Sequence, residues 1–282
     1  MYPLLKKALL RSAFFIAWLF ALPTEGWAET RLCPDLRIAG QGQVQQIYDG
    51  DTIELNDGRK VRLLGINTPE IDHQQGHSEP FAIQARDRLK QLVPPGTSVR
   101  LQTDVEKTDR YGRVLAHLLL PDGSNPAVVL LQEGLATLLI LPPNIAAANC
   151  FAAYERGARK RSMGIWNHSR YQPMAVTLLA HGKPRTGYQV LEGRITQVAA
   201  SRKFHYFIVG NRLSVRVSKR DWTDYFGHPF APTWPGAIPP QQLLGGQVTI
   251  RGWLRAGHPE RKLHYALPQM RLYHPAGLEW MP

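Results

Sequence analysis

Hydrophobic and polar positions alternate along most of residues 44–66, which is the pattern of half-buried strands. The alternation breaks at Asp49-Gly50 and again over residues 56–58, where Asn-Asp-Gly is a strong hairpin turn. Two further strands are predicted over residues 97–105 and 114–124. The first half of the chain is therefore predicted to contain several short strands joined by tight turns.

A helical pattern of apolar residues appears in three other segments. The first covers residues 78–93 and begins at Ser78, which is a favourable N-cap residue. The second covers residues 125–136 and ends near a glycine, and the third covers residues 148–166. With the strands, these segments predict a first domain over residues 33–168.

Strand-like alternation returns after residues 169–187, which we interpret as a linker. The predicted strands cover residues 188–201, 203–210, 212–219, 245–257 and 262–273, and one short helix is predicted over residues 221–226. This pattern predicts a second domain over residues 188–282. Five short strands favour a small all-β barrel over a sandwich.

Residues 1–28 have the layout of a secretory signal peptide: a basic start, a short apolar run, a proline and small residues before the expected cleavage site. A single membrane anchor is the alternative, but the apolar run is shorter than the ~20 residues a span needs. We expect export to the periplasm or medium, with no membrane anchor after cleavage.

The two cysteines, Cys33 and Cys150, both follow the expected signal peptide. An even number of cysteines in an oxidising compartment favours one disulfide between them. Two separate buried thiols are the alternative.

The chain carries 34 lysines and arginines against 22 acidic residues, a net charge of +12. This excess favours a polyanionic partner such as nucleic acid, anionic lipid or an acidic polymer. A solvated basic surface without a specific partner is the alternative.

Three short motifs in the first domain carry residues suited to phosphodiester chemistry: YDGDT at 48–52, RLLGINTPE at 62–70 and TDRYGR at 108–113. Arginines neutralise developing charge on a phosphate, and a carboxylate can orient or deprotonate a water nucleophile. Oxygen ligands can hold a divalent ion beside the phosphate. The candidate residues are Asp51, Arg62, Asn67, Thr68, Glu70, Arg110, Tyr111 and Arg113.

With these spacings, residues 44–166 resemble the staphylococcal nuclease (thermonuclease) family. The resemblance implies an OB-type five-stranded barrel with three helices, and calcium-dependent cleavage of DNA and RNA. By position, Arg62 and Arg113 resemble the two arginines that clamp the scissile phosphate, and Glu70 resembles the carboxylate that acts on the attacking water. Arg110 and Tyr111 resemble the pair that contacts a second phosphate.

The resemblance also implies a Ca²⁺ site in which Asp51 is a ligand and Thr68 lends its backbone carbonyl. The family's second calcium carboxylate falls at Asn67, so one negative charge is missing there. We interpret Asp49 as a turn residue and not as a ligand. The aromatic residues that pack a nucleotide base in the family have no counterpart in residues 137–144.

The second domain interleaves arginines and lysines with aromatic residues, in a layout that resembles a small OB-fold binding domain. Either these residues bind nucleic acid, or the aromatics fill the barrel and the bases face water. For the whole protein we predict an exported calcium-dependent nuclease. The alternatives are a catalytically weak or inactive nuclease-fold protein that binds nucleic acid or another envelope polyanion, and a structural envelope protein. The interleaved basic and aromatic residues of the second domain are Arg202, Lys203, Phe204, His205, Tyr206, Trp253, Arg255, Arg261, Lys262, His264 and Tyr265.

Overall fold

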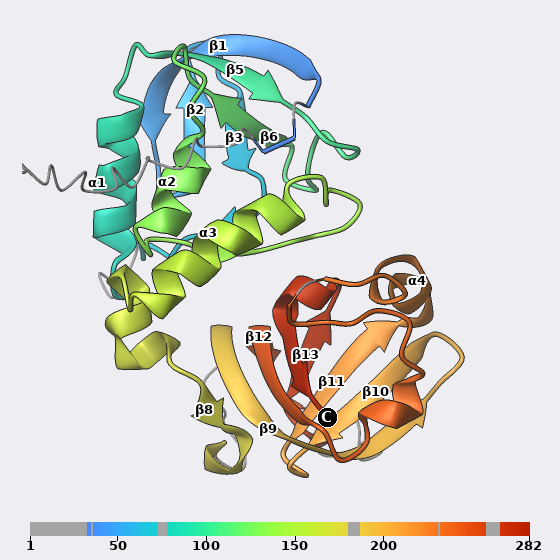
Figure 1. The fold of residues 1–282 in the computed structure, drawn as a ribbon. Helices are drawn as coiled ribbons and strands as arrows, with labels where there is room; N and C mark the ends of the chain where they lie inside the picture. Colours follow the sequence, from blue (N-terminus) through green and yellow to red (C-terminus); the bar gives the residue numbers. More distant parts are fainter. Residues whose placement is uncertain (1–32, 35, 73–77, 180–186, 231, 258–265) are drawn as a thin grey trace, which may run out of the picture. The chain divides into compact units, whose positions relative to one another are not determined.

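Two β-barrels follow one another along the chain in the computed structural model (Figure 1). The structure describes residues 33–34, 36–72, 78–179, 187–230, 232–257 and 266–282. The expected signal peptide, residues 1–28, lies outside these residues. Within them, no helix is long and apolar enough to cross a membrane. Residues 32–282 form one compact unit, which contains both barrels.

The first barrel closes through five strands in the order β1-β2-β3-β6-β5. All neighbouring strands are antiparallel except β3 and β6, which are parallel. This closed five-stranded arrangement is the OB-type barrel that the resemblance implied. A separate two-stranded pair, β4 with β7, lies outside the barrel. The strands are β1 (Ile38–Ile47), β2 (Thr52–Leu55), β3 (Lys60–Leu63), β4 (Ile66–Asn67), β5 (Ser98–Gln102), β6 (Val114–Leu119) and β7 (Thr137–Leu138).

The three predicted helices are present, with two corrections at their ends. They are α1 (Ala82–Leu92), α2 (Pro126–Gln132) and α3 (Ala148–Lys160). Ser78 is not an N-cap, because the chain enters α1 through Phe81 in a left-handed conformation. The predicted third helix ends at Lys160, because Ser162 and Gly164 take positive φ values of 51° and 53°.

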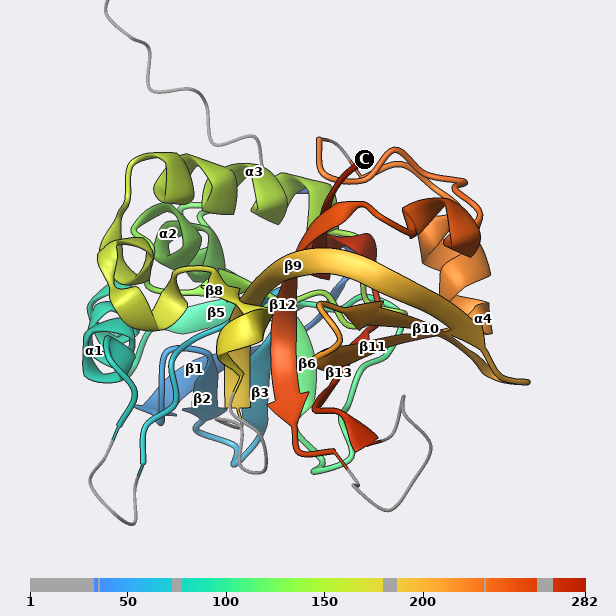
Figure 2. The same cartoon turned by 90° about the horizontal axis from the view of Figure 1, so that it is seen from below.

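The second barrel also closes through five strands, with one parallel pair among them (Figure 2). Its strands run in the order β9-β10-β11-β13-β12 and back to β9, and only β11 and β13 in this ring are parallel. This confirms the predicted barrel. The strands are β9 (Gly187–Ala200), β10 (Phe204–Val209), β11 (Leu213–Ser218), β12 (Gln247–Arg255) and β13 (Gln269–Leu272). Four of the basic and aromatic residues predicted to bind, Arg261, Lys262, His264 and Tyr265, lie outside the described residues.

Two short strands that sequence analysis missed extend the second sheet: β8 (Met174–Ala175) beside β9, and β14 (Leu278–Met281) beside β12. The segment interpreted as a linker, 169–187, therefore contains structure in its first part, while residues 180–186 are not described. The predicted helix over residues 221–226 is α4 followed by η4. The remaining helical turns are α4 (Lys219–Asp221), η1 (Gly164–Asn167), η2 (Ser169–Tyr171), η3 (Val176–Leu178), η4 (Trp222–Phe226), η5 (Pro240–Leu243) and η6 (Pro275–Gly277).

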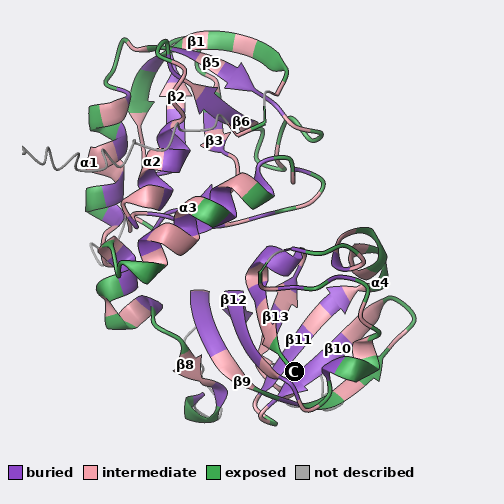
Figure 3. Cartoon of the chain, viewed as in Figure 1, coloured by how far each residue is buried: buried purple, intermediate pink, exposed green. Residues whose placement is uncertain are grey.

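Burial follows the two-residue strand period in only some strands (Figure 3). In β12, residues 248–252 are all buried, and only the last three residues alternate. In β3, by contrast, Val61 and Leu63 belong to the core, whereas Lys60 is exposed and Arg62 is half-buried. Such alternation places one row of side chains in the barrel and the other row on its outer surface.

Helix α3 is joined both to the segment before the first barrel and to the second barrel. The predicted disulfide joins Cys33 to Cys150 at its start. Further along α3, the buried carboxylate of Glu155 pairs with the buried guanidinium of Arg251 from β12. The second barrel is thus held to the helix that covers the first.

Candidate active site

One cleft of about 480 Å³ brings together seven of the eight predicted phosphate-site and metal-site residues. The eighth, Thr68, is buried behind the cleft, and its backbone N–H donates a hydrogen bond to Asp51. The seven are Asp51, Arg62, Asn67, Glu70, Arg110, Tyr111 and Arg113. They come from loops and strands up to about 60 residues apart in sequence, so the barrel assembles what the motifs only suggested.

Strand pairing sets the positions of the central residues. Arg62 in β3 lies opposite Thr52 in β2 and beside Leu115 in β6. Between β3 and β4, Gly65 has φ of +82°, and an added Cβ would lie 2.6 Å from the ring of Phe151. Only glycine fits this turn without strain, and the turn returns the chain to the cleft at Asn67.

Asp51 is buried and accepts hydrogen bonds at both carboxylate oxygens. Oδ2 accepts from the Thr68 N–H at 2.9 Å and from its hydroxyl at 3.2 Å, and it lies 3.0 Å from Nη2 of Arg62. Oδ1 accepts from the hydroxyl of Thr52 at 3.1 Å. These donors hold the carboxylate in a fixed orientation beside the arginine.

Arg62 is fixed by three kinds of acceptor. Its Nη1 donates to the backbone carbonyls of Leu63 and Ile66 at 2.7 and 3.0 Å, and Nη2 faces Asp51 and the side-chain oxygen of Asn67. The side chain is only 14% exposed. A guanidinium held in this way needs little reorganisation when negative charge develops nearby.

Arg113 is oriented by the turn before β6. Its Nε donates to Asp109 at 2.8 Å, and the same carboxylate accepts from the backbone N–H groups of Tyr111 and Arg113. The guanidinium of Arg110 lies over the ring of Tyr111, 4.7 Å from its centroid. Tyr111 is 68% exposed, so this pair stands at the solvent-facing edge of the cleft.

Glu70 stands at the mouth of the cleft. Desolvation, followed by the negative charge of Asp51, raises its pKa above the ordinary value, and Arg62 partly opposes the shift. Its backbone exchanges hydrogen bonds with Glu79: the Glu70 N–H donates to Oε2 at 3.0 Å, and the Glu79 N–H donates to the Glu70 carbonyl at 2.9 Å. Glu79 in turn pairs with Arg170 at 3.1 Å.

Asp49 is a cleft residue that sequence analysis took for a turn residue alone. It does hold the turn, because its carboxylate accepts from the Asp51 N–H at 2.8 Å. Desolvation and the neighbouring charge of Asp51 raise the pKa of Asp49 to about 7. The D-x-D spacing was a usable signal, since a two-residue separation across a tight turn can bring two carboxylates together.

The oxygen donors of the cleft fit a hard divalent cation. Asp49 and Asp51 are carboxylates that repel one another, and a cation between them would relieve that repulsion. Asn67 and Thr68 could add an amide and a backbone oxygen, although the Asn67 amide now donates to the Thr68 carbonyl at 3.1 Å. Among the residues that the structure describes, no group of three or more His, Cys, Asp or Glu side chains is placed to hold a metal.

Trp253, from the second barrel, also lines this cleft. Sequence analysis placed it among aromatic residues of the second domain and had no signal that it would reach the first. Its position follows from tertiary packing alone.

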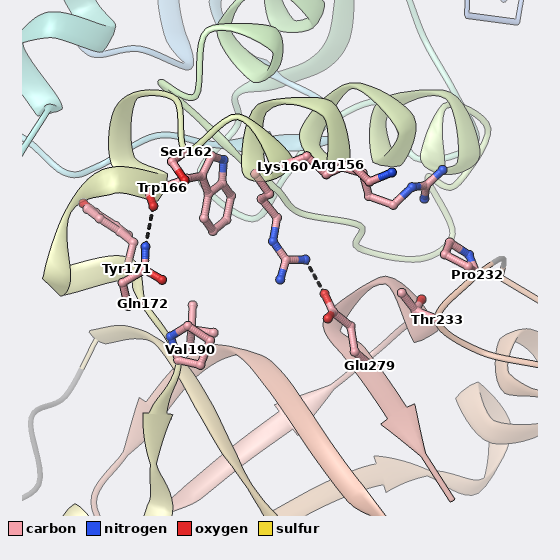
Figure 4. Close-up of a pocket in the computed structure, with 12 residues that line it drawn as sticks. Arg156, Lys160, Ser162, Trp166, Tyr171, Gln172, Val190, Pro232, Thr233 and Glu279 are labelled. Atoms are coloured by element: carbon pink, nitrogen blue, oxygen red, sulfur yellow. Dashed lines mark hydrogen bonds and ion pairs between the residues drawn. The ribbon is translucent and has the colours of Figure 1, made fainter.

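A second cavity, of about 460 Å³, contains none of the predicted site residues (Figure 4). Trp166 and Tyr171 line it on one side and Val190 on another, and an ion pair between Arg159 and Glu279 crosses it. It is an open hollow next to η1, η2 and β14, and its carboxylate, Glu279, is already paired with Arg159.

Comparisons of the sequence with known proteins find similarity to nucleases over the first barrel and its helices. The model of the family described as "Staphylococcal nuclease homologue" matches residues 60–168. The chain is 35% identical over 126 residues to the "Thermonuclease" of Staphylococcus intermedius. This alignment covers 44% of this chain and 74% of that protein. It is 30% identical over 139 residues to an "Uncharacterized endonuclease" of Escherichia coli, covering 48% and 80%.

A third relative shows the limit of the match. The "Endonuclease YhcR" of Bacillus subtilis (strain 168) is 30% identical over 140 residues, which is 46% of this chain and 12% of that protein. The chain thus spans well under two thirds of some of its relatives. In all three alignments, less than half of this chain is matched.

Proposed function

The chain belongs to the staphylococcal nuclease family, and on this premise we propose that it hydrolyses phosphodiester bonds of DNA or RNA in the cleft of its first barrel. The observation that carries the proposal is the convergence of Arg62, Arg113 and Glu70 on one cleft, beside the fixed carboxylate of Asp51. A phosphodiester placed there would meet two cations and a carboxylate of raised pKa.

In the proposed reaction, a water molecule attacks the phosphorus while Glu70 accepts a proton from it. Negative charge develops on the phosphate oxygens, and the guanidinium groups of Arg62 and Arg113 donate hydrogen bonds to them. The bond to the leaving oxygen then breaks, and that oxygen takes a proton from solvent. Arg110 and Tyr111 would contact a neighbouring phosphate of the same strand.

A calcium ion, when bound, would neutralise a further phosphate oxygen. Asp51, Asn67 and Thr68, with Asp49 added from the structure, would hold it. Their part is to place oxygen ligands next to Arg62, so that the arginine and the ion face the same phosphate.

The test is cleavage of single-stranded DNA and RNA with and without a calcium chelator. We expect Arg62→Gln, Arg113→Gln and Glu70→Gln each to lower kcat by about 10²- to 10³-fold, as for loss of one preorganised group. The matched control is Arg59→Gln, which removes an arginine of the same barrel that pairs with Asp57 away from the cleft. The proposal fails if the cleft variants cleave as fast as that control.

A second candidate is a nucleic-acid-binding protein of nuclease fold that has lost cleavage. Asn67 favours it, because an amide stands where the family pattern has a carboxylate, and Arg62 is already paired with Asp51. Absence of cleavage at any calcium concentration, together with retained binding of oligonucleotides, would select this candidate.

The proposal also includes export of a two-domain protein. It is supported by the signal-like composition of residues 1–28 and by the disulfide between Cys33 and Cys150, since disulfides persist in oxidising compartments. Amino-terminal sequencing of the protein recovered from periplasm and medium tests it. A cytosolic product that retains residues 1–28 would refute export.

A further inference from the structure

Trp253 lines two neighbouring hollows, the active-site cleft and a groove of about 120 Å³ on the second barrel. It is 36% exposed, and none of the other tryptophans that the structure describes is as exposed. Its ring makes an edge contact with Tyr188 at 5.6 Å between centroids, with planes at 82°. This contact holds the ring in place while about a third of the residue's surface still faces solvent.

The groove beyond Trp253 is positively charged. It is lined by Arg216, Trp253, Arg255, Gln269, Arg271 and Tyr273, and none of these is acidic. Arg216 and Arg271 lie opposite one another on the paired strands β11 and β13. A nearby carboxylate, Asp221, lies 3.6 Å from Arg271. Like charges held side by side favour an anionic ligand between or above them.

Two features prepare these arginines for such a ligand. The Nε atoms of Arg216 and Arg271 are buried and, among the described residues, have no hydrogen-bond partner. The guanidinium of Arg216 lies over Phe204 at 5.3 Å, and that of Arg271 lies over Tyr273 at 4.3 Å. Aromatic faces of this kind hold a guanidinium flat and leave its edge available to a phosphate.

The combination of an exposed aromatic ring and a line of arginines fits single-stranded nucleic acid. Bases of a single strand can stack on an aromatic ring while the phosphates follow the cations, whereas bases in a duplex are already stacked on one another. Residues 137–144 lack aromatics, so a ring from the second barrel would supply what the first barrel lacks.

We propose that a single strand of DNA or RNA runs from the active-site cleft across Trp253 into the arginine groove. One base stacks on Trp253, and the following phosphates contact Arg216, Arg255 and Arg271. This inference rests on the proposed function, because it assumes that the cleft holds a phosphate of the same strand.

The test is binding of a labelled twelve-nucleotide thymidine strand, followed by fluorescence anisotropy with a chelator present to prevent cleavage. An abasic strand of the same length is the key comparison, because it offers phosphates without bases. Trp253→Ala should weaken binding of the thymidine strand by about 5- to 150-fold, the range for loss of one stacked base. On the abasic strand it should change affinity by less than about twofold.

Arg255→Gln should weaken binding of both strands and reduce the slope of log affinity against log salt by about 0.7, as expected for one lost phosphate contact. Arg220→Gln is the matched control. It removes an arginine of the same barrel whose side chain is 88% exposed and pairs with Asp224 outside the groove, so both strands should bind as before. Trp253→Phe, which keeps an aromatic ring, should retain most of the affinity and guards against a folding defect in Trp253→Ala.

The proposed path is overturned if Trp253→Ala binds the thymidine strand normally, or if it weakens both strands equally. Cleavage measured on the same preparations separates the two proposals. Normal cleavage with Trp253-independent binding would refute the path and leave the nuclease function standing. Absence of cleavage with Trp253-dependent binding would refute the nuclease function and leave the path standing.

Discussion

The buried ion pair between Arg251 and Glu155 is the contact whose removal should affect the whole molecule most. The two side chains are 6% and 1% exposed, and they join β12 of the second barrel to α3. Arg251→Met leaves the carboxylate of Glu155 buried without its cation. Breaking a buried pair on one side costs about 3–5 kcal/mol, so the free energy of unfolding should fall by that amount.

Removal of the ion pair should also affect the active site. Oε1 of Glu155 accepts a hydrogen bond from the backbone N–H of Leu138 at 2.7 Å, and Leu138 lies in β7, which pairs with β4. Strand β4 ends at Asn67, one of the proposed cation ligands. A Glu155 carboxylate that moves toward solvent would loosen β7, so we expect weaker calcium binding in Arg251→Met as well as lower stability.

Urea unfolding, followed by circular dichroism, measures the stability of Arg251→Met and of the double variant Arg251→Met/Glu155→Gln. The double variant removes the uncompensated charge but keeps an acceptor for Leu138, so it should recover at least about 1 kcal/mol of the loss. Arg220→Met, which breaks an exposed pair, should cost less than about 1 kcal/mol. A cost for Arg251→Met no larger than for Arg220→Met, or no recovery in the double variant, would refute the reasoning.

Three further predictions concern metal, pH and the disulfide. Asn67→Asp adds a negative ligand, so calcium should bind at least about tenfold more tightly by calorimetry, and unchanged affinity would contradict the proposed ligand set. Burial lowers the pKa of His117 to about 4, from about 6.5 when unfolded, so its neutral form favours folding above pH 6.5 and this contribution is lost as the pH falls to 4. Between pH 7.5 and pH 4, the free energy of unfolding of His117→Gln should therefore fall by up to roughly 3 kcal/mol less than that of the unmodified protein. Equal decreases in the two proteins, measured by urea titration, would refute this. Cys33→Ser/Cys150→Ser opens a loop between residues 117 apart and should lower stability by about 4–5 kcal/mol, whereas a loss below about 1 kcal/mol would contradict the entropic argument.

The sequence was sufficient for most of the two barrels, because strand and hairpin patterns are local. Alternation of apolar residues and the Asn-Asp-Gly turn identified the strands of the first barrel except the first half of β1, which begins at Ile38, whereas the predicted pattern began at residue 44. The same periodicity identified the ring of the second barrel. The two-residue strands β7 and β8 were missed, because two residues carry no periodicity, and the four-residue strand β14 was missed as well. The start of α1 was misplaced, because the left-handed conformation of Phe81 depends on its surroundings and not on a capping residue.

The residues of the candidate site were also named from the sequence, since its motifs resemble those of the nuclease family position by position. By itself the sequence determined the nuclease-type motif, the amide at Asn67 and the pair of cysteines. Only the tertiary structure decided that Asp49 is buried next to Asp51, so that desolvation and the neighbouring charge raise its pKa, and that Trp253 lines the cleft from the second barrel. The physical reason is that electrostatic coupling and stacking depend on distances through space, which packing between barrels sets and which local sequence does not encode.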